Sequence, residues 1–151
     1  MDSFADNNFF WLDKYAIGQD TIDKQHQYLF ELANIIVDPY NDPQTTYLNI
    51  QALYEYTQTH FRDEELLMEQ CDYPDYENHK KAHRQLIAKL NTVGNGILTD
   101  EAPRTVVIHF MKDWILTHIL SEDMRFGNFL RTSASFTDSL QTQQDSASTN
   151  S

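Results

Sequence analysis

The stretch THFRDEELLMEQCDYPDYENHKKAH, residues 59–83, twice places potential metal ligands four residues apart. His60 and Glu64 form the first pair, and His79 and His83 form the second. An α-helix turns about 100° per residue, so residues four apart lie one above the other on the same face. Each pair can therefore bind one small ligand if its segment is helical. One such pair alone would be weak support for a metal site.

Helix start and stop signals divide the chain into four segments. Its four glycines and four prolines fall mainly at the expected boundaries. Asp42 is a cap followed by Pro43 at the first helical position, which is a strong start signal. We expect helices from Asp20 or Thr21 to about Val37, from Pro43 to about Gln70, from 72–74 to about 94–96, and from 99–103 to about Leu130. No segment alternates polar and apolar residues over the length of a strand.

Each expected helix carries an apolar stripe at three- and four-residue steps. The stripes consist of Ile22, Leu29, Ala33 and Ile36; Leu53, Thr57 and Leu67; Leu86 and Leu90; and Val107, Met111 and Trp114. Four such helices with short connections predict an all-α fold, an up-down-up-down antiparallel four-helix bundle. Five histidines and Glu64 lie on the same stripes and would face the core.

The antiparallel arrangement brings potential ligands from all four helices to one end of the bundle. This set contains His26, His60, Glu64, His79, His83, His118 and Asp123. Buried polar groups without partners cost about 1–3 kcal/mol each. A metal centre would satisfy all seven, so we predict one. His109 lies about half a turn away from His118 and is excluded.

Asp123 poses a geometric problem, because it follows His118 by five residues. In a regular α-helix five residues correspond to about 500°, which leaves Asp123 about 140° round from His118. Two solutions are open. The helix can widen by a π-type turn, which is frequent at functional sites. Alternatively, the side chain can reach round from a flank.

Composition excludes several classes of protein. The chain has 151 residues and a formal net charge of −12, which disfavours binding to nucleic acid or to an anionic membrane. Its single cysteine, Cys71, suits a reducing compartment. We see no signal peptide and no apolar run long enough to span a membrane. We therefore expect a cytoplasmic monomer without membrane insertion. The expected parts are an N-terminal arm (1–19), the bundle (20–131) and a disordered Ser/Thr/Gln-rich tail (132–151).

Four motifs resemble the hemerythrin family, in particular the bacterial hemerythrins, over residues 11–130. They are DKQH at 23–26, HFRDEE at 60–65, HKKAH at 79–83 and HILSED at 118–123. The resemblance implies a non-haem di-iron centre in which His79, His83 and His118 bind one iron and His26 and His60 the other. Glu64 and Asp123 would bridge the two ions together with an oxo or hydroxo group. Trp11 and Tyr15 would belong to an arm that packs on the bundle.

The implied function is reversible binding of O2 for carriage, storage or delivery, without enzymatic activity. A count of the implied ligands leaves one coordination position open on the iron that is bound by two histidines. Four side chains within a turn of a ligand could line a pocket there: Leu29, Phe61, Trp114 and Ile115. Ordinary core packing explains the presence of each of them equally well. Two alternatives stay open, a sensor of O2, NO or redox state and a di-iron enzyme acting on O2, NO or peroxide. The excess of histidine over carboxylate favours binding, because oxygenase-type di-iron bundles use Glu and Glu-x-x-His ligands.

Overall fold

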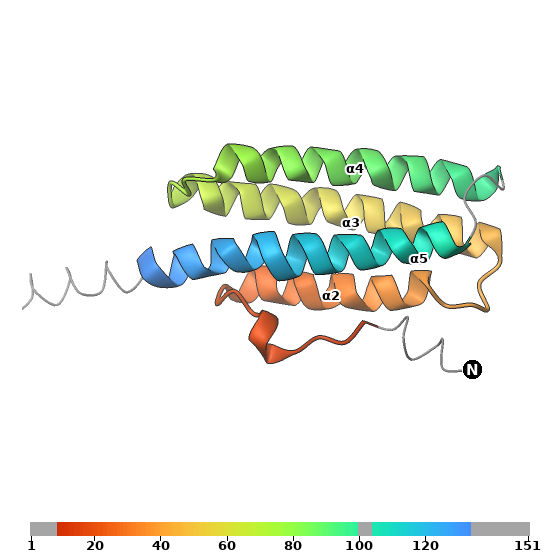
Figure 1. Cartoon of the computed structure of the whole chain (residues 1–151), viewed down its shortest axis with the longest axis horizontal. Coiled ribbons are helices and arrows are strands. Elements are labelled where there is room, and N and C mark those ends of the chain that lie inside the picture. The colour runs from red at the N-terminus through yellow and green to blue at the C-terminus, as the bar shows by residue number, and fades with distance from the viewer. Residues whose placement is uncertain (1–8, 100–103, 134–151) are drawn as a thin grey trace, which may run out of the picture.

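Four helices lie side by side in an antiparallel bundle (Figure 1). The computed structural model describes residues 9–99 and 104–133. The helices are α2 (Asp20–Ile36), α3 (Pro43–Gln70), α4 (Tyr76–Leu98) and a fourth that starts as α5 (Arg104–Asp113). The fourth continues through a π-helical segment, η2 (Trp114–Asp123), and stays helical over 124–133. The described ranges contain no strand. The predicted all-α, up-down-up-down four-helix bundle is therefore confirmed.

The helix starts show where local signals were sufficient. The carboxylate of Asp42 accepts a 2.7 Å hydrogen bond from the backbone N–H of Thr45, as expected of a cap before Pro43. The cap predicted for α2 was wrong, because the side chain of Gln19 accepts the hydrogen bond from the Thr21 N–H. The fourth helix begins at Arg104 in the described part of the chain. Of the start signals expected at 99–103, Thr99 is instead the C-cap of α4, and 100–103 lie outside that part.

The boundaries of α4 also differ from the prediction. Its N-cap is Asp75 and not a residue of 72–74. Asp72 adopts a left-handed backbone conformation with φ of 55°, and the backbone N–H of Tyr73 donates a hydrogen bond to the carbonyl oxygen of Met68. Both residues therefore still belong to the end of α3. The helix then runs past Gly94 to Leu98. A Cβ added at Gly94 would meet Ile50 Cγ2 at 3.2 Å. This glycine therefore permits close packing of α4 on α3 and does not end the helix.

The apolar stripes form two buried clusters with a polar layer between them. The larger cluster fills the bundle on the side of Leu29, Leu53 and Met111, and the smaller one contains Ile22, Met68, Tyr73 and Phe126. Most predicted stripe residues are buried, but two are only half-buried: Leu67 and Leu86. Met68, four residues after Glu64, takes the core position expected for Leu67. The polar layer lies where each helix passes from one apolar cluster to the other.

Residues 9–19 pack along the bundle as an extended arm with a short 3-10 turn, η1 (Asp13–Tyr15). Asp23 holds the arm by accepting hydrogen bonds from the backbone N–H groups of Ile17 (2.7 Å) and Gly18 (3.2 Å). The ring of Trp11 makes an edge contact with Phe30 and a tilted contact with His26. The remainder of the predicted arm, 1–8, lies outside the described residues.

The fourth helix continues past residue 131, the predicted end of the bundle. Thr132 and Ser133 are still helical, and the Thr132 hydroxyl donates to the carbonyl of Asn128. The rest of the predicted tail, 134–151, lies outside the described residues. None of the helices in the described ranges is long and apolar enough to cross a membrane.

Candidate metal centre

The seven side chains singled out in the sequence lie together in the polar layer of the bundle. They form two groups, one of Glu64, His79, His83, His118 and Asp123, and one of His26, His60, Glu64 and Asp123. Within each group the candidate ligand atoms lie within 4.8 Å of one another. All seven residues are buried, with exposed fractions between 0% and 3%. His109 is exposed and belongs to neither group, as the facing argument predicted.

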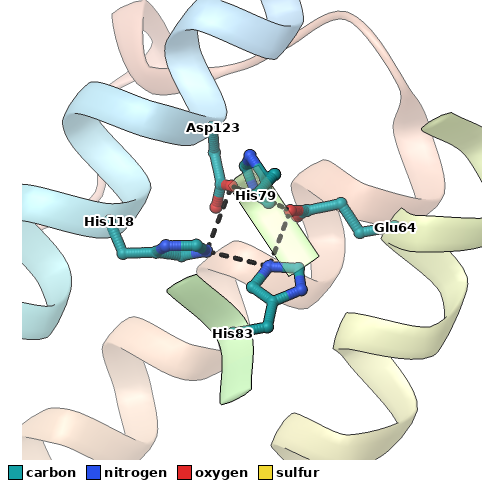
Figure 2. Close-up of side chains that lie close together, drawn as sticks. All are labelled: Glu64, His79, His83, His118 and Asp123. Carbon is teal, nitrogen blue, oxygen red and sulfur yellow. Dashed lines mark hydrogen bonds and ion pairs between the residues drawn. The ribbon is translucent and has the colours of Figure 1, made fainter. Parts of the chain in front are cut away.

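The first group converges from α3, α4 and η2 (Figure 2). His79 Nε2 lies 2.6 Å from Glu64 Oε1 and 2.9 Å from Asp123 Oδ1. His83 Nε2 lies 3.0 Å from His118 Nε2 and 3.2 Å from Glu64 Oε1. His118 Nε2 lies 3.3 Å from Asp123 Oδ1. Three imidazole nitrogens therefore face one oxygen from each carboxylate.

The second group uses the opposite oxygens of the same two carboxylates. His26 Nε2 lies 3.0 Å from Asp123 Oδ2 and 3.5 Å from Glu64 Oε2. His60 Nε2 lies 3.3 Å from Glu64 Oε2. Each carboxylate thus presents one oxygen to the three-histidine group and the other to the two-histidine group. This is the arrangement that a pair of bridged cations needs.

A π-helical segment places Asp123 in the cluster. Segment η2 begins at Trp114 and ends at Asp123, and its hydrogen bonds connect residues five apart. Five residues then make about one turn, so Asp123 follows His118 on the same face. Of the two solutions left open by the sequence, the widened helix is the one observed.

Burial and charge together tune the pKa values of these groups. Burial disfavours the imidazolium of His79, but the Asp123 and Glu64 carboxylates outweigh it and raise the pKa of His79 to about 10. The same balance raises the pKa of His26 to about 9. For His60 burial prevails and lowers the pKa to about 4. Burial also opposes ionisation of Glu64, yet its contacts with His26, His79 and His83 hold its pKa well below its ordinary value. The Glu64 carboxylate is therefore anionic and His60 neutral at pH 7.

Several of these buried atoms have no hydrogen-bond partner among the described residues. They are His26 Nδ1 and Nε2, His60 Nε2, Glu64 Oε2 and both carboxylate oxygens of Asp123. His26 Nε2 approaches Asp123 Oδ2 closely, but the angles there do not make a hydrogen bond. Orphaned buried polar atoms are costly, and shared cations would satisfy all of these except His26 Nδ1. Imidazole and carboxylate donors together suit iron, zinc or manganese. The donor set therefore fits a transition-metal site.

Comparison with known proteins places the chain in a family. A family model described as hemerythrin HHE cation binding domain matches residues 17–130. The chain belongs to the hemerythrin family. It is 30% identical to a myohemerythrin of Sipunculus nudus over 119 residues, covering 78% of this chain and 90% of that protein. It is 29% identical to a bacteriohemerythrin of Clostridium acetobutylicum over 129 residues, covering 78% of this chain and 98% of that protein.

Solved structures of hemerythrin variants share the fold. One of them superposes with a TM-score of 0.71 at 24% sequence identity and covers 80% of this chain and 95% of its own. At this level of identity the likeness concerns the four-helix bundle alone. The family that the four motifs indicated and the bundle that the apolar stripes predicted are thus both confirmed.

The outward-facing nitrogens of three histidines have partners that sequence reasoning missed in this hemerythrin-family chain. His83 Nδ1 lies 2.7 Å from Glu65 Oε2, and His118 Nδ1 lies 3.3 Å from Glu122 Oε2. The Nδ1 atom of the third, His60, lies 2.7 Å from Gln25 Oε1. Glu122 could have been found, because a residue four positions after His118 would share its face in a regular α-helix. The other two pairs join different helices, so no spacing in the sequence reveals them.

The predicted pocket residues all lie in the large apolar cluster next to the site. Leu29, Phe61, Trp114 and Ile115 are each exposed by 4% or less. The Phe61 ring stacks on the His83 ring, with centroids 3.6 Å apart and planes 5° apart, and it also contacts His60 and His118. A surface hollow between α3 and α4 is lined in part by Phe61, Glu65 and His83. Apolar side chains therefore cover the histidines on this side.

Proposed function

We propose that this chain holds two iron ions and binds O2 reversibly, as a carrier, store or donor of oxygen. The observation that carries the proposal is the division of each carboxylate between two histidine groups. His79, His83 and His118 would bind one ion, His26 and His60 the other, and Glu64 and Asp123 would bridge them. The donor atoms would accept several metals. Membership of the hemerythrin family supports iron.

The unequal number of histidines makes the two halves of the site different. Three imidazole nitrogens serve one half and two serve the other, while both halves share the same carboxylates. When bound, the iron pair would supply the two electrons and the free coordination position that O2 binding requires. The two-histidine half is therefore the proposed place of ligand binding.

The protein's own contribution is an apolar surrounding with few proton donors. Leu29, Phe61, Trp114 and Ile115 would exclude water from the ligand while admitting a small apolar molecule such as O2 or NO. Outside the seven proposed ligands, the buried charged or hydroxyl-bearing side chains of residues 9–99 and 104–133 are those of Asp23, Thr57 and Tyr73, and Trp114 adds a buried indole N–H. Asp23 is occupied by the arm. No separate buried carboxylate, histidine or lysine is thus free to act as an acid or base in this part of the chain, which favours binding over enzymatic turnover.

Metal analysis and O2 titration test the proposal. Iron-loaded protein should contain two irons and no haem per chain. After reduction it should gain an absorption band on exposure to O2 and lose that band when the O2 pressure falls, without added reductant. One metal per chain would contradict the ligand assignment. Irreversible oxidation in one step would instead support a redox sensor or a di-iron enzyme.

We further propose that the protein acts as a monomer in the cytoplasm, without nucleic-acid or membrane partners. The net charge of −12 would repel phosphate groups, and a single half-buried Cys71 suits a reducing compartment. Sedimentation of the iron-loaded protein tests the monomer. A concentration-dependent shift to twice the mass would overturn it.

A further inference from the structure

The outer partner of His60 differs in kind from those of His83 and His118. Glu65 and Glu122 are carboxylates, which can only accept a hydrogen bond, so they select the tautomer with hydrogen on Nδ1. Gln25 is an amide, which can accept with its oxygen or donate with its nitrogen. Gln25 alone would therefore leave the tautomer of His60 undetermined.

Asp63 determines which way the amide of Gln25 faces. The Gln25 Nε2 group donates to Asp63 Oδ2 at 2.8 Å, and an ionised carboxylate cannot donate in return. The amide nitrogen must then face Asp63, which turns Gln25 Oε1 toward His60 Nδ1 at 2.7 Å. Only an Nδ1–H can satisfy that oxygen. His60 Nε2 is left with a free lone pair in the cluster, where it has no hydrogen-bond partner among the described residues.

We propose that Gln25 and Asp63 are positioning residues that hold His60 in the Nδ1–H tautomer, so that Nε2 can bind the metal of the two-histidine half. Asp63 hydrogen-bonds to Gln25 and not to a proposed ligand, so it acts through Gln25, across the contact of α2 with α3. The proposal rests on the proposed function for the metal, but the tautomer can be measured without it.

The same relay makes the two halves of the site electronically unequal. A carboxylate pulls harder on an imidazole N–H than a neutral amide does, which makes the imidazole a stronger donor to a metal. His83 and His118 have carboxylates at this position, whereas His60 has an amide. The proposed ligand-binding half is thus the one with the weaker histidine donor. A weaker donor disfavours further oxidation of the metal ion that would be bound there.

The proposal is tested by exchanging amide and carboxylate side chains at positions 25 and 63. Asp63→Asn keeps the shape and a hydrogen bond to Gln25 but allows Gln25 to turn its nitrogen toward His60, which permits the wrong tautomer. The double variant Gln25→Glu/Asp63→Asn restores an acceptor beside His60 and a donor beside that acceptor, with the net charge unchanged. Glu55→Gln, an exposed change of the same charge on α3, is the matched control.

Two measurements should be made on each full-length variant. Nitrogen-15 NMR of the His60 ring, in metal-free protein, should show Nδ1–H in the wild type, the control and the double variant, and its loss in Asp63→Asn. Competition with a chelator should show about 10- to 100-fold weaker binding of one of two metal ions in Asp63→Asn. The double variant should recover that affinity, with a lower iron reduction potential than the wild type.

Each contrary result has a distinct meaning. If Asp63→Asn keeps the Nδ1–H signal, the relay is overturned even if two irons bind as proposed. If Asp63→Asn and the double variant lose metal equally, the pair has only a structural role and the inference is wrong. If the tautomer responds as expected but the wild type binds no iron pair, the relay holds and the proposed function fails. Thermal melting of every variant checks that the fold is retained.

Discussion

Asp123 lies one π-helical turn beyond His118, which brings its Oδ1 to 3.3 Å from the imidazole Nε2. A regular α-helix would turn this carboxylate about 140° away from the histidine. The widened segment therefore gives one helix two adjacent ligands while its apolar residues, such as Trp114 and Ile119, remain in the core. Such a segment costs some backbone stability, and a bound cation shared by His118 and Asp123 would offset this cost.

Replacement of a proposed ligand should remove metal and stability together. His79→Ala is expected to lose at least one ion per chain, because His79 Nε2 lies within 2.9 Å of both shared carboxylates. Its melting temperature should fall, since a metal bound only to the folded state stabilises that state. His109→Ala is the control, because His109 is exposed and outside the cluster. Equal metal loss in the two variants, measured by elemental analysis, would show that the assignment is wrong.

Enlargement of the apolar pocket should shorten the life of the O2 complex. Ile115→Ala should admit water beside the two-histidine half and speed its irreversible oxidation, as measured by the decay of the O2-dependent absorption band. Ile36→Ala is a matched control, because Ile36 is also buried but lies ten residues beyond His26, about 15 Å along α2. Both changes should destabilise the fold by about 2–5 kcal/mol. Equal decay rates in both variants would exclude Ile115 from the pocket.

Loss of the contact that anchors the arm should destabilise the bundle. Asp23→Ala removes the acceptor for the backbone N–H groups of Ile17 and Gly18, and the buried Ile17 N–H would have no replacement. We expect a loss of about 1–3 kcal/mol in the free energy of unfolding, measured with urea. Asp20→Ala, an exposed change in the same first turn of α2, should have a much smaller effect. A similar loss of unfolding free energy in both variants would mean that the charge near the helix start, and not the contact with the arm, stabilises the fold.

The cap of α3 should contribute stability that is lost in acid. A hydrogen bond from the backbone N–H of Thr45 lowers the pKa of the Asp42 carboxyl below its ordinary 3.8. A lowered folded-state pKa means that the contribution is fully present above about 3.8 and disappears as the pH falls through the folded value. At pH 7 Asp42→Ala should melt below the wild type, whereas Asp42→Asn should keep most of the cap. The difference between wild type and Asp42→Ala should shrink in acid; an unchanged difference at low pH would contradict this account.

Local sequence features were sufficient for the four helices and for the set of seven side chains. Helix periodicity depends only on the spacing of residues along the chain, so it shows that His60 and Glu64 share a face with the apolar stripe. The Asp42–Pro43 start was predicted for the same reason, because a cap involves neighbours in sequence. Predictions were less accurate where a distant contact decided the outcome. Gly94 lies inside α4, where it permits close packing against Ile50 of α3, and Met68 replaces Leu67 in the core.

The sequence alone determined which residue types reach the polar layer, because helical spacing and short antiparallel connections leave little choice of face or end. Only the tertiary structure decided how their atoms are used. It showed that Glu64 and Asp123 each divide their oxygens between two histidine groups, that η2 widens to include Asp123, and that Gln25 on α2 meets His60 on α3. These relationships depend on hydrogen bonds and packing between helices, whose geometry is set when the side chains of all four are buried together.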